Sequence, residues 1–134
     1  MHLILDGHVE NVELMTDKAL MKAWLAETVE KAGMTCFGEA FIYGFPWPGS
    51  VDWTALTGFQ PLMESHCSIH CWPERKYVFS DLFSCKDFND KKLVRHIKRS
   101  FKMDKSAVPL VLDRGIDSRT GEIIPTKVRG AFRL

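Results

Sequence analysis

Apolar residues return every three or four positions in two parts of the chain, and this spacing is typical of one face of a helix. The first stripe consists of Leu20, Met21, Trp24, Leu25 and Val29. The second consists of Leu93, Val94, Ile97 and Phe101. Thr16 or Asp17 can cap the first helix, which we expect to end at Gly33. Asp87 or Asn89 can cap the second helix.

The other apolar runs are short and rich in β-branched and aromatic residues, which favours strands. The expected strands cover residues 3–5, 34–43, 58–63, 67–72, 77–83 and 108–112. A loop rich in Pro and Gly covers residues 44–50, and the tail from Arg114 onward has no clear pattern.

Helices that come singly between runs of strands predict an α+β fold. We expect a two-layer α/β sandwich, with a mostly antiparallel sheet and two helices on one face. Residues 1–134 are enough for a single domain. One layer of helices leaves the other face of the sheet uncovered, so we expect a second copy of the chain to cover it in a homodimer.

Composition narrows the class of protein. A content of 46% hydrophobic and 26% charged residues is ordinary for a soluble globular domain. A net charge of +1 argues against nucleic acid or an anionic membrane as the main partner. The basic run at residues 91–99 contains apolar residues at helical spacing, which indicates the solvated face of a helix.

No segment approaches the ~20 apolar residues of a membrane span. The start of the chain is too short and uncharged for a signal peptide. The four cysteines therefore favour a reduced, cytoplasmic protein. We expect Cys36, Cys67 and Cys71 to fill the core.

Reactive side chains concentrate in residues 64–74, which read Glu-Ser-His-Cys-Ser-Ile-His-Cys-Trp-Pro-Glu. On a strand, the even-numbered residues 66–70 would point to one face and the odd-numbered residues 67–71 to the other. A further thiol, Cys85, closes the next apolar run. Nucleophiles, a histidine and a thiol on neighbouring strands are the ingredients of covalent catalysis.

Residues 64–74 closely resemble the self-cleavage site of the prokaryotic S-adenosylmethionine decarboxylase proenzymes, which usually reads Glu-Ser-His-x-x-Ile-His-x-Trp-Pro-Glu. The similarity covers most of the chain and is densest over residues 58–85. The separations from Ser65 to His70 and from Ser65 to Cys85 equal those of the family. The resemblance implies a proenzyme that cleaves itself into residues 1–64 and 65–134.

The resemblance also implies the chemistry of this cleavage. The Ser65 hydroxyl attacks the carbonyl of Glu64 and replaces the amide by an ester. A base then removes the Cα proton of Ser65, the ester leaves by elimination, and the dehydroalanine that remains hydrolyses to a pyruvoyl cofactor. Backbone strain at Ser65 and a hydrogen-bond donor to the oxyanion would both assist this reaction.

Each matching position acquires an expected role from the resemblance. Ser65 becomes the pyruvoyl group and Glu64 ends the small chain. His70 is the base of the elimination, and Cys85 returns a proton to the substrate carbon after carbon dioxide leaves. The pyruvoyl ketone forms a Schiff base with the substrate amine, and the adjacent amide accepts the carbanion electrons. The family usually has a serine where this chain has Thr57, which keeps the hydroxyl that assists processing.

The resemblance implies S-adenosylmethionine as the substrate and an aminopropyl donor for spermidine synthesis as the product. We expect His66 and Glu74 to contact the substrate, although His66 could instead only flank the site. Phe45, Trp47 and Trp53 could form an aromatic wall for the adenine ring, and core or loop packing is their alternative role.

Two other functions stay open. Residues 44–63 depart from the family pattern, so a decarboxylase of a basic amino acid, ornithine or arginine, is an alternative on the same fold. A homologue that never cleaves and serves as a binding or regulatory subunit is another.

A zinc site built from the two His-Cys pairs of residues 66–71 would draw all its ligands from one strand. Structural zinc usually draws on two separated pairs, so we expect no metal.

Overall fold

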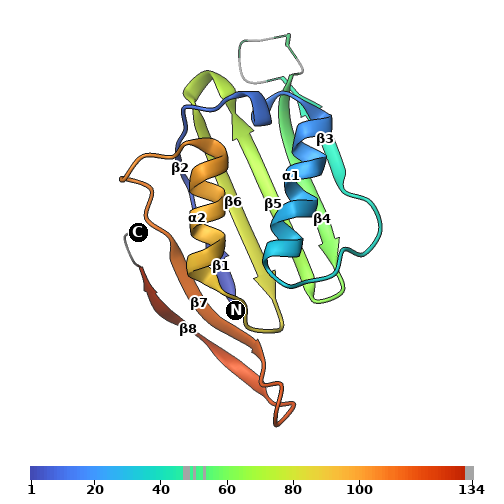
Figure 1. The fold of residues 1–134 in the computed structure, drawn as a ribbon, viewed down its shortest axis with the longest axis vertical. Coiled ribbons are helices and arrows are strands. Elements are labelled where there is room, and N and C mark those ends of the chain that lie inside the picture. The colour runs from blue at the N-terminus through green and yellow to red at the C-terminus, as the bar shows by residue number, and fades with distance from the viewer. Residues whose placement is uncertain (47–48, 50, 53, 132–134) are drawn as a thin grey trace.

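The structure is a computed structural model, and it describes residues 1–46, 49, 51–52 and 54–131. Within these residues, eight strands form one antiparallel sheet, and two α-helices lie side by side on one of its faces (Figure 1). The strands are β1 (His2–Ile4), β2 (Gly7–His8), β3 (Phe41–Phe45), β4 (Ala55–Leu62), β5 (Ser65–Trp72), β6 (Tyr77–Ser84), β7 (Leu110–Ile116) and β8 (Ile123–Ala131). The helices are α1 (Lys18–Lys31) and α2 (Asp90–Phe101), with short 3₁₀ turns η1 (Glu13–Met15) and η2 (Pro73–Arg75). The predicted α+β class and its two layers are confirmed.

Both helices begin at a predicted cap. The Asp17 side chain accepts a hydrogen bond from the Leu20 N–H at 2.9 Å, and the Asn89 side chain accepts one from the Lys92 N–H at 2.9 Å. The first helix ends as expected before Gly33, whose φ of 71° suits glycine.

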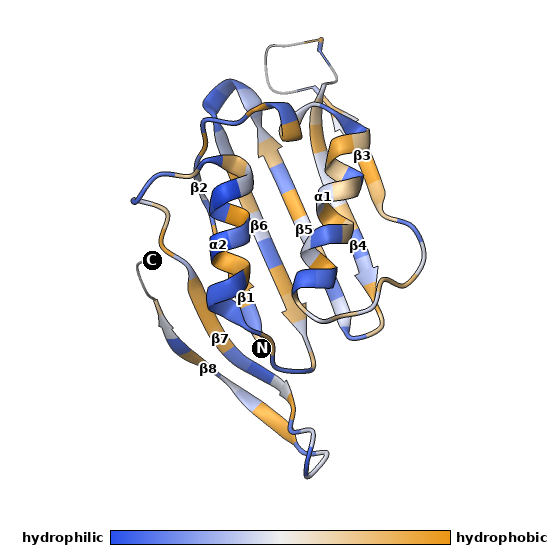
Figure 2. Ribbon diagram, viewed as in Figure 1, coloured by the Kyte–Doolittle hydropathy of each residue, from blue (hydrophilic) through white to orange (hydrophobic). Residues whose placement is uncertain are grey.

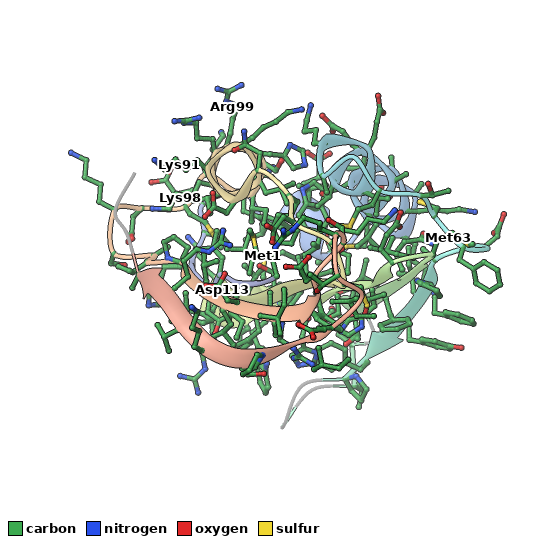
Figure 3. The ribbon with its side chains drawn as sticks, turned by 90° about the horizontal axis from the view of Figure 1, so that it is seen from below. Met1, Met63, Lys91, Lys98, Arg99 and Asp113 are labelled. Carbon is green, nitrogen blue, oxygen red and sulfur yellow. The ribbon has the colours of Figure 1, made fainter. Side chains whose placement is uncertain are left out.

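The apolar stripes of the helices face the sheet, with one exception. In α1 the buried residues are Met21, Trp24, Leu25, Thr28 and Val29. Leu20, which we expected in this stripe, is 37% exposed because it lies at the edge of the buried face. All four apolar residues of the α2 stripe are buried, as predicted. Lys91 and Arg99 lie on the opposite side of α2, toward solvent, which confirms the interpretation of the basic run (Figure 3).

The order of strands across the sheet is β3-β4-β5-β6-β1-β7-β8, and β2 also pairs with β6. Polar and apolar residues alternate along the central strand β5 (Figure 2). Its odd-numbered residues Cys67, Ile69 and Cys71 are buried under the helices, as predicted. Its even-numbered residues 66, 68 and 70 lie on the opposite face, which we call the open face. Within the described residues, no helix covers the open face (Figure 3).

The structure differs most from the sequence prediction in two segments, apart from the short unpredicted strand β2 and an earlier start of β4. The strand predicted at residues 34–43 is wrong over most of its length, because β3 begins only at Phe41. Before it, only Cys36 pairs with the sheet, through an isolated bridge to Leu62. The tail, which had no clear pattern, forms the end of β7 and all of β8. Most residues of β8 are exposed, so no buried stripe marks this strand in the sequence.

Candidate active site

Ser65 lies at the entry to β5, directly after a tight hairpin turn. Leu62 at the end of β4 pairs with Ser65, so only residues 63 and 64 form the turn. On its other side Ser65 pairs with Ser84, the last residue of β6, and this places Cys85 beside Glu64. The Cys85 N–H donates a hydrogen bond of 3.1 Å to the Glu64 carbonyl oxygen. This carbonyl belongs to the peptide bond that self-cleavage would break.

The backbone of Ser65 is unusual. Its φ is 158°, and it is one of three non-glycine residues with a positive φ in the described part of the chain. Residues in sparsely populated backbone regions cost about 1–3 kcal/mol and tend to occur at functional sites. In this conformation the Ser65 Oγ lies 3.1 Å from Nδ1 of the next residue, His66.

The side chain of Glu64 is held against the neighbouring chain segments. It accepts a hydrogen bond from the Thr35 N–H at 3.2 Å, and the Lys86 Nζ lies 3.5 Å from its other oxygen. Burial alone would raise the pKa of Glu64, but the Thr35 hydrogen bond and the Lys86 charge bring the pKa below its usual value. Glu64 is therefore a carboxylate at neutral pH, and both residues of the expected cleavage site are fixed in place.

A second group of predicted residues lies at the opposite end of β5. Thr57 pairs with His70 across β4 and β5, and its Oγ1 lies 2.7 Å from His70 Nδ1. The ring of Phe45 stacks on the His70 ring, with 4.7 Å between their centroids. Burial lowers the pKa of His70 below the usual 6.5, so the ring is neutral at pH 7 and can accept a proton.

Asp81 lies between these two groups, on the open face of β6. Its Oδ1 is 3.5 Å from Nε2 of both His2 and His66, and its Oδ2 accepts a hydrogen bond of 2.6 Å from Ser68. Burial would raise the pKa of Asp81, but its contacts with His2, Ser68 and His66 lower it below its usual value. A hollow of about 390 Å³ runs along the open face from Asp81 to Thr57 and His70.

The structure therefore brings the predicted residues together in two separate groups. Glu64, Ser65 and Cys85 form one group, and Thr57 and His70 form the other. His70 follows Ser65 by five positions on the same strand. At about 3.3 Å per residue, the two are roughly 16 Å apart along β5. Within one chain, His70 cannot reach the Cα proton of Ser65.

The other predicted residues are more scattered. Glu74 is exposed in η2, beyond the His70 end of β5. Trp47 and Trp53 lie outside the described residues. Cys67 and Cys71 face the helices, and burial raises the pKa of each thiol to about 12, which suits core residues. The prediction that Cys36 also fills the core is wrong, because Cys36 is exposed in the segment before β3.

The histidines of the zinc alternative lie on the face of β5 opposite these two cysteines. In the part of the chain that the structure describes, no three His, Cys, Asp or Glu side chains are grouped to hold a metal ion. No helix there is long and apolar enough to cross a membrane.

Sequence reasoning missed two residues of this region. Asp81 lies in an apolar run, and only the sheet register reveals that it faces His66. Gly115 has a φ of 128°, and a Cβ at this position would lie 2.8 Å from the Cys85 carbonyl oxygen. This glycine therefore lets β7 pack directly against the backbone of Cys85. Its place in the unassigned tail gave no signal of this contact.

Comparisons with known proteins show which family this chain resembles. A family model described as S-adenosylmethionine decarboxylase matches residues 1–115. An S-adenosylmethionine decarboxylase proenzyme of Archaeoglobus fulgidus is 31% identical over 115 residues, which are 85% of this chain and 96% of the relative. A proenzyme of the same name from Clostridium botulinum is 28% identical over 117 residues, or 87% of this chain and 95% of the relative.

Among solved structures, the adenosylmethionine decarboxylase of Aquifex aeolicus has a similar fold. The TM-score is 0.69 at 20% sequence identity, and the match covers 90% of this chain and 94% of the other.

Proposed function

This chain belongs to the S-adenosylmethionine decarboxylase family, and from that premise we propose that it is a self-processing, pyruvoyl-dependent decarboxylase of S-adenosylmethionine. In this proposal the chain breaks between Glu64 and Ser65. Ser65 then becomes the pyruvoyl cofactor of the large chain, and the product supplies aminopropyl groups for spermidine synthesis.

The hydrogen bond from the Cys85 N–H to the Glu64 carbonyl carries this proposal. An attack by Ser65 Oγ would place a negative charge on that carbonyl oxygen, and the Cys85 N–H already points at it from 3.1 Å. A donor fixed in advance at the place where charge develops is worth about 10²–10³-fold in rate in other acyl-transfer sites. The unusual φ of Ser65 and the turn that holds Glu64 support the same reaction.

We infer that His70 acts on Ser65 of a second copy of the chain. Its ring is neutral, hydrogen-bonded to Thr57 and about 16 Å from Ser65 of its own strand. The open face carries exposed aromatic side chains, among them Tyr43 at 65% and Phe79 at 45% exposure. A second sheet packed over this face in the opposite direction would bury these rings and bring each His70 to the Ser65 of its partner.

In the mature enzyme the pyruvoyl group would supply an electron sink for the carbanion that decarboxylation leaves. The β5–β6 register and the contact with Gly115 hold the backbone of Cys85 near residue 65, which supports a role for its thiol in returning a proton to that carbon. Phe45 at the His70 end is a candidate wall for adenine, and Glu74 is a candidate partner for the sulfonium cation.

The intact mass of the purified protein tests the central claim. We expect two fragments, residues 1–64 and 65–134, with the larger one blocked at its N-terminus. The two should stay together in gel filtration, because β4 and β5 pair at six positions across the cut. Ser65→Ala should remain whole, while Ser118→Ala, a serine in the exposed turn after β7, should cleave normally. An unmodified chain that stays whole after long incubation would instead support a non-catalytic binding or regulatory subunit.

Two further measurements address the partner and the substrate. Sedimentation should give twice the chain mass of 15.3 kDa, and a stable monomer that still cleaves would rule out action by the partner's His70. Release of carbon dioxide from carboxyl-labelled S-adenosylmethionine should far exceed release from ornithine or arginine. If one of these amino acids is the better substrate, the self-cleavage proposal survives and the spermidine assignment fails.

A further inference from the structure

We propose that His66, positioned by Asp81, takes the proton from the Ser65 hydroxyl in the first step of self-cleavage and delivers it to the Ser65 nitrogen. This inference rests on the proposed self-cleavage of the Glu64–Ser65 bond. It gives His66 a role before any substrate is bound.

The contacts form a continuous path from the nucleophile to a carboxylate. Ser65 Oγ lies 3.1 Å from His66 Nδ1, and His66 Nε2 lies 3.5 Å from Asp81 Oδ1. Side chains of consecutive residues in a regular strand point to opposite faces of the sheet, which would separate Ser65 from His66. The φ of 158° at Ser65 departs from regular strand geometry, and in this conformation the hydroxyl reaches the histidine.

Asp81 can fix the orientation of the His66 ring and decide which ring nitrogen carries the proton. Ser68 occupies its Oδ2 with a hydrogen bond of 2.6 Å, which leaves Oδ1 to face His66 and His2. A carboxylate next to Nε2 favours the proton on that nitrogen, so Nδ1 keeps a free lone pair toward Ser65. The aromatic rings of Phe59 and Phe83 hold the His66 ring from two sides, at centroid distances of 5.6 and 5.9 Å.

The proton balance of the step is closed within this group. As Ser65 Oγ forms its bond to the Glu64 carbonyl carbon, the hydroxyl proton moves to His66 Nδ1. When the carbon–nitrogen bond breaks, that proton passes to the Ser65 nitrogen, which becomes a free amine. His66 ends the step with the protons it had at the start, and no other reactant is needed. The Cys85 N–H stabilises the carbonyl oxygen between the two transfers.

Self-cleavage needs two proton transfers, and the two histidines of the motif would each carry out one of them. His66 would serve the acyl shift within its own chain, and His70 of the partner would later remove the Cα proton. The structure supports the separation because His66 touches the Ser65 hydroxyl, whereas His70 is about 16 Å away along the strand.

The experiment measures ester formation alone, in a His70→Ala background where the later elimination is blocked. Hydroxylamine cleaves an ester at residues 64/65 and does not cleave the amide, so the yield of fragments against time reports the acyl shift. His66→Ala in this background should slow the shift by about 100-fold, which is typical of a lost general base. Asp81→Asn should slow it by about tenfold, because the amide lacks the negative charge that favours the proton on Nε2.

His2→Ala is the matched control, because His2 lies at the same 3.5 Å from Asp81 and has no contact with Ser65. It should form the ester within about twofold of the background rate. Added imidazole should restore part of the rate to His66→Ala and none to Asp81→Asn, an effect that a merely structural role would not produce. Thermal unfolding checks that each variant is folded, and His66→Asn replaces His66→Ala if the latter is not.

The outcomes separate the two proposals. If the His70→Ala chain never becomes sensitive to hydroxylamine, and Ser65 is also unprocessed in the unmodified chain, self-cleavage itself fails. If the ester forms in His70→Ala and His66→Ala forms it at the same rate, the role of His66 is overturned and self-cleavage stands. Equal slowing by His2→Ala and His66→Ala would also overturn it, because the effect would then come from the packing around Asp81.

Discussion

The two ends of β5 hold the two groups of candidate site residues, and their surroundings differ. At the first end, Ser65 has an unusual backbone, a histidine neighbour and an amide donor aimed at the carbonyl before it. At the other end, His70 is part of a regular ladder, hydrogen-bonded to Thr57 and stacked on Phe45. In the proposed reaction, the first end holds the bond that breaks, and the other end holds the neutral His70 ring, which would act as the base.

Under the proposed function, each active site would combine the Ser65 end of one chain with the His70 end of another. Five residues of extended strand separate the two ends by a distance that a proton cannot cross directly. His66 near the first end and His70 at the other both lie on the open face. Two copies packed face to face in opposite directions would make two complete sites.

Co-expression of Ser65→Ala and His70→Ala chains should restore cleavage that neither variant shows alone. In a mixed dimer, the His70→Ala chain still has Ser65 and its partner still has His70, so one complete site exists. Denaturing electrophoresis with differently tagged chains should show cleavage of the His70→Ala chain only. If the mixed sample stays whole while the unmodified protein cleaves, His70 does not act across the interface.

Cys85→Ala should separate maturation from turnover. The backbone N–H at residue 85 remains, so fragments should still form, although more slowly if the packing shifts. Turnover should fall by about 100-fold because the proton donor is lost. Fragment yield and carbon dioxide release from the same sample give both quantities. Equal turnover in Cys85→Ala and the parent would remove the thiol from the mechanism.

Thr57→Val should slow maturation by about tenfold, or roughly 1.4 kcal/mol, because it removes the hydroxyl that contacts His70 and keeps the side-chain shape. Thr57→Ser keeps the hydroxyl and serves as the matched control, with a rate close to that of the parent. Cleavage kinetics by mass spectrometry compare the two. A slower Thr57→Ser than Thr57→Val would show that packing, and not the hydrogen bond, matters here.

The pH dependence of maturation should reflect the burial of His70. Because burial lowers its pKa below 6.5, the neutral base persists in mildly acidic solution, and the rate should fall only with a midpoint below 6.5. The free energy of unfolding should also depend on pH through buried histidines. Burial also lowers the pKa of His96, although Glu27 opposes this, so the unfolded chain binds more protons than the fold as pH drops through 6.5.

Urea unfolding of the uncleaved Ser65→Ala variant should therefore give a smaller free energy of unfolding at pH 5.5 than at pH 7.5. An equal or larger value at pH 5.5 would contradict the burial of these two histidines.

Much of the fold could be predicted, because the apolar pattern of the sequence matches the residues that are buried in the structure. The stripes of α1 and α2 matched the buried faces of both helices apart from Leu20, and alternation along β5 separated Cys67 and Cys71 from His66 and His70. The prediction failed at residues 34–40 and at β8. The first segment has strand-like composition without a full strand partner, and β8 is an exposed edge strand with no buried stripe to reveal it.

The family could be identified from the amino-acid sequence alone, because residues 64–74 and their spacing to Cys85 match the family pattern. The same match supplied the candidate reactive residues. How these residues combine depends on the pairing of the strands in the folded chain. Register across β6 put the Cys85 N–H against the Glu64 carbonyl and Asp81 against His66, and the extended form of β5 held His70 away from Ser65. Pairing between strands is set by contacts over long sequence distances, which no local pattern records, and it is these contacts that turn a motif into a site.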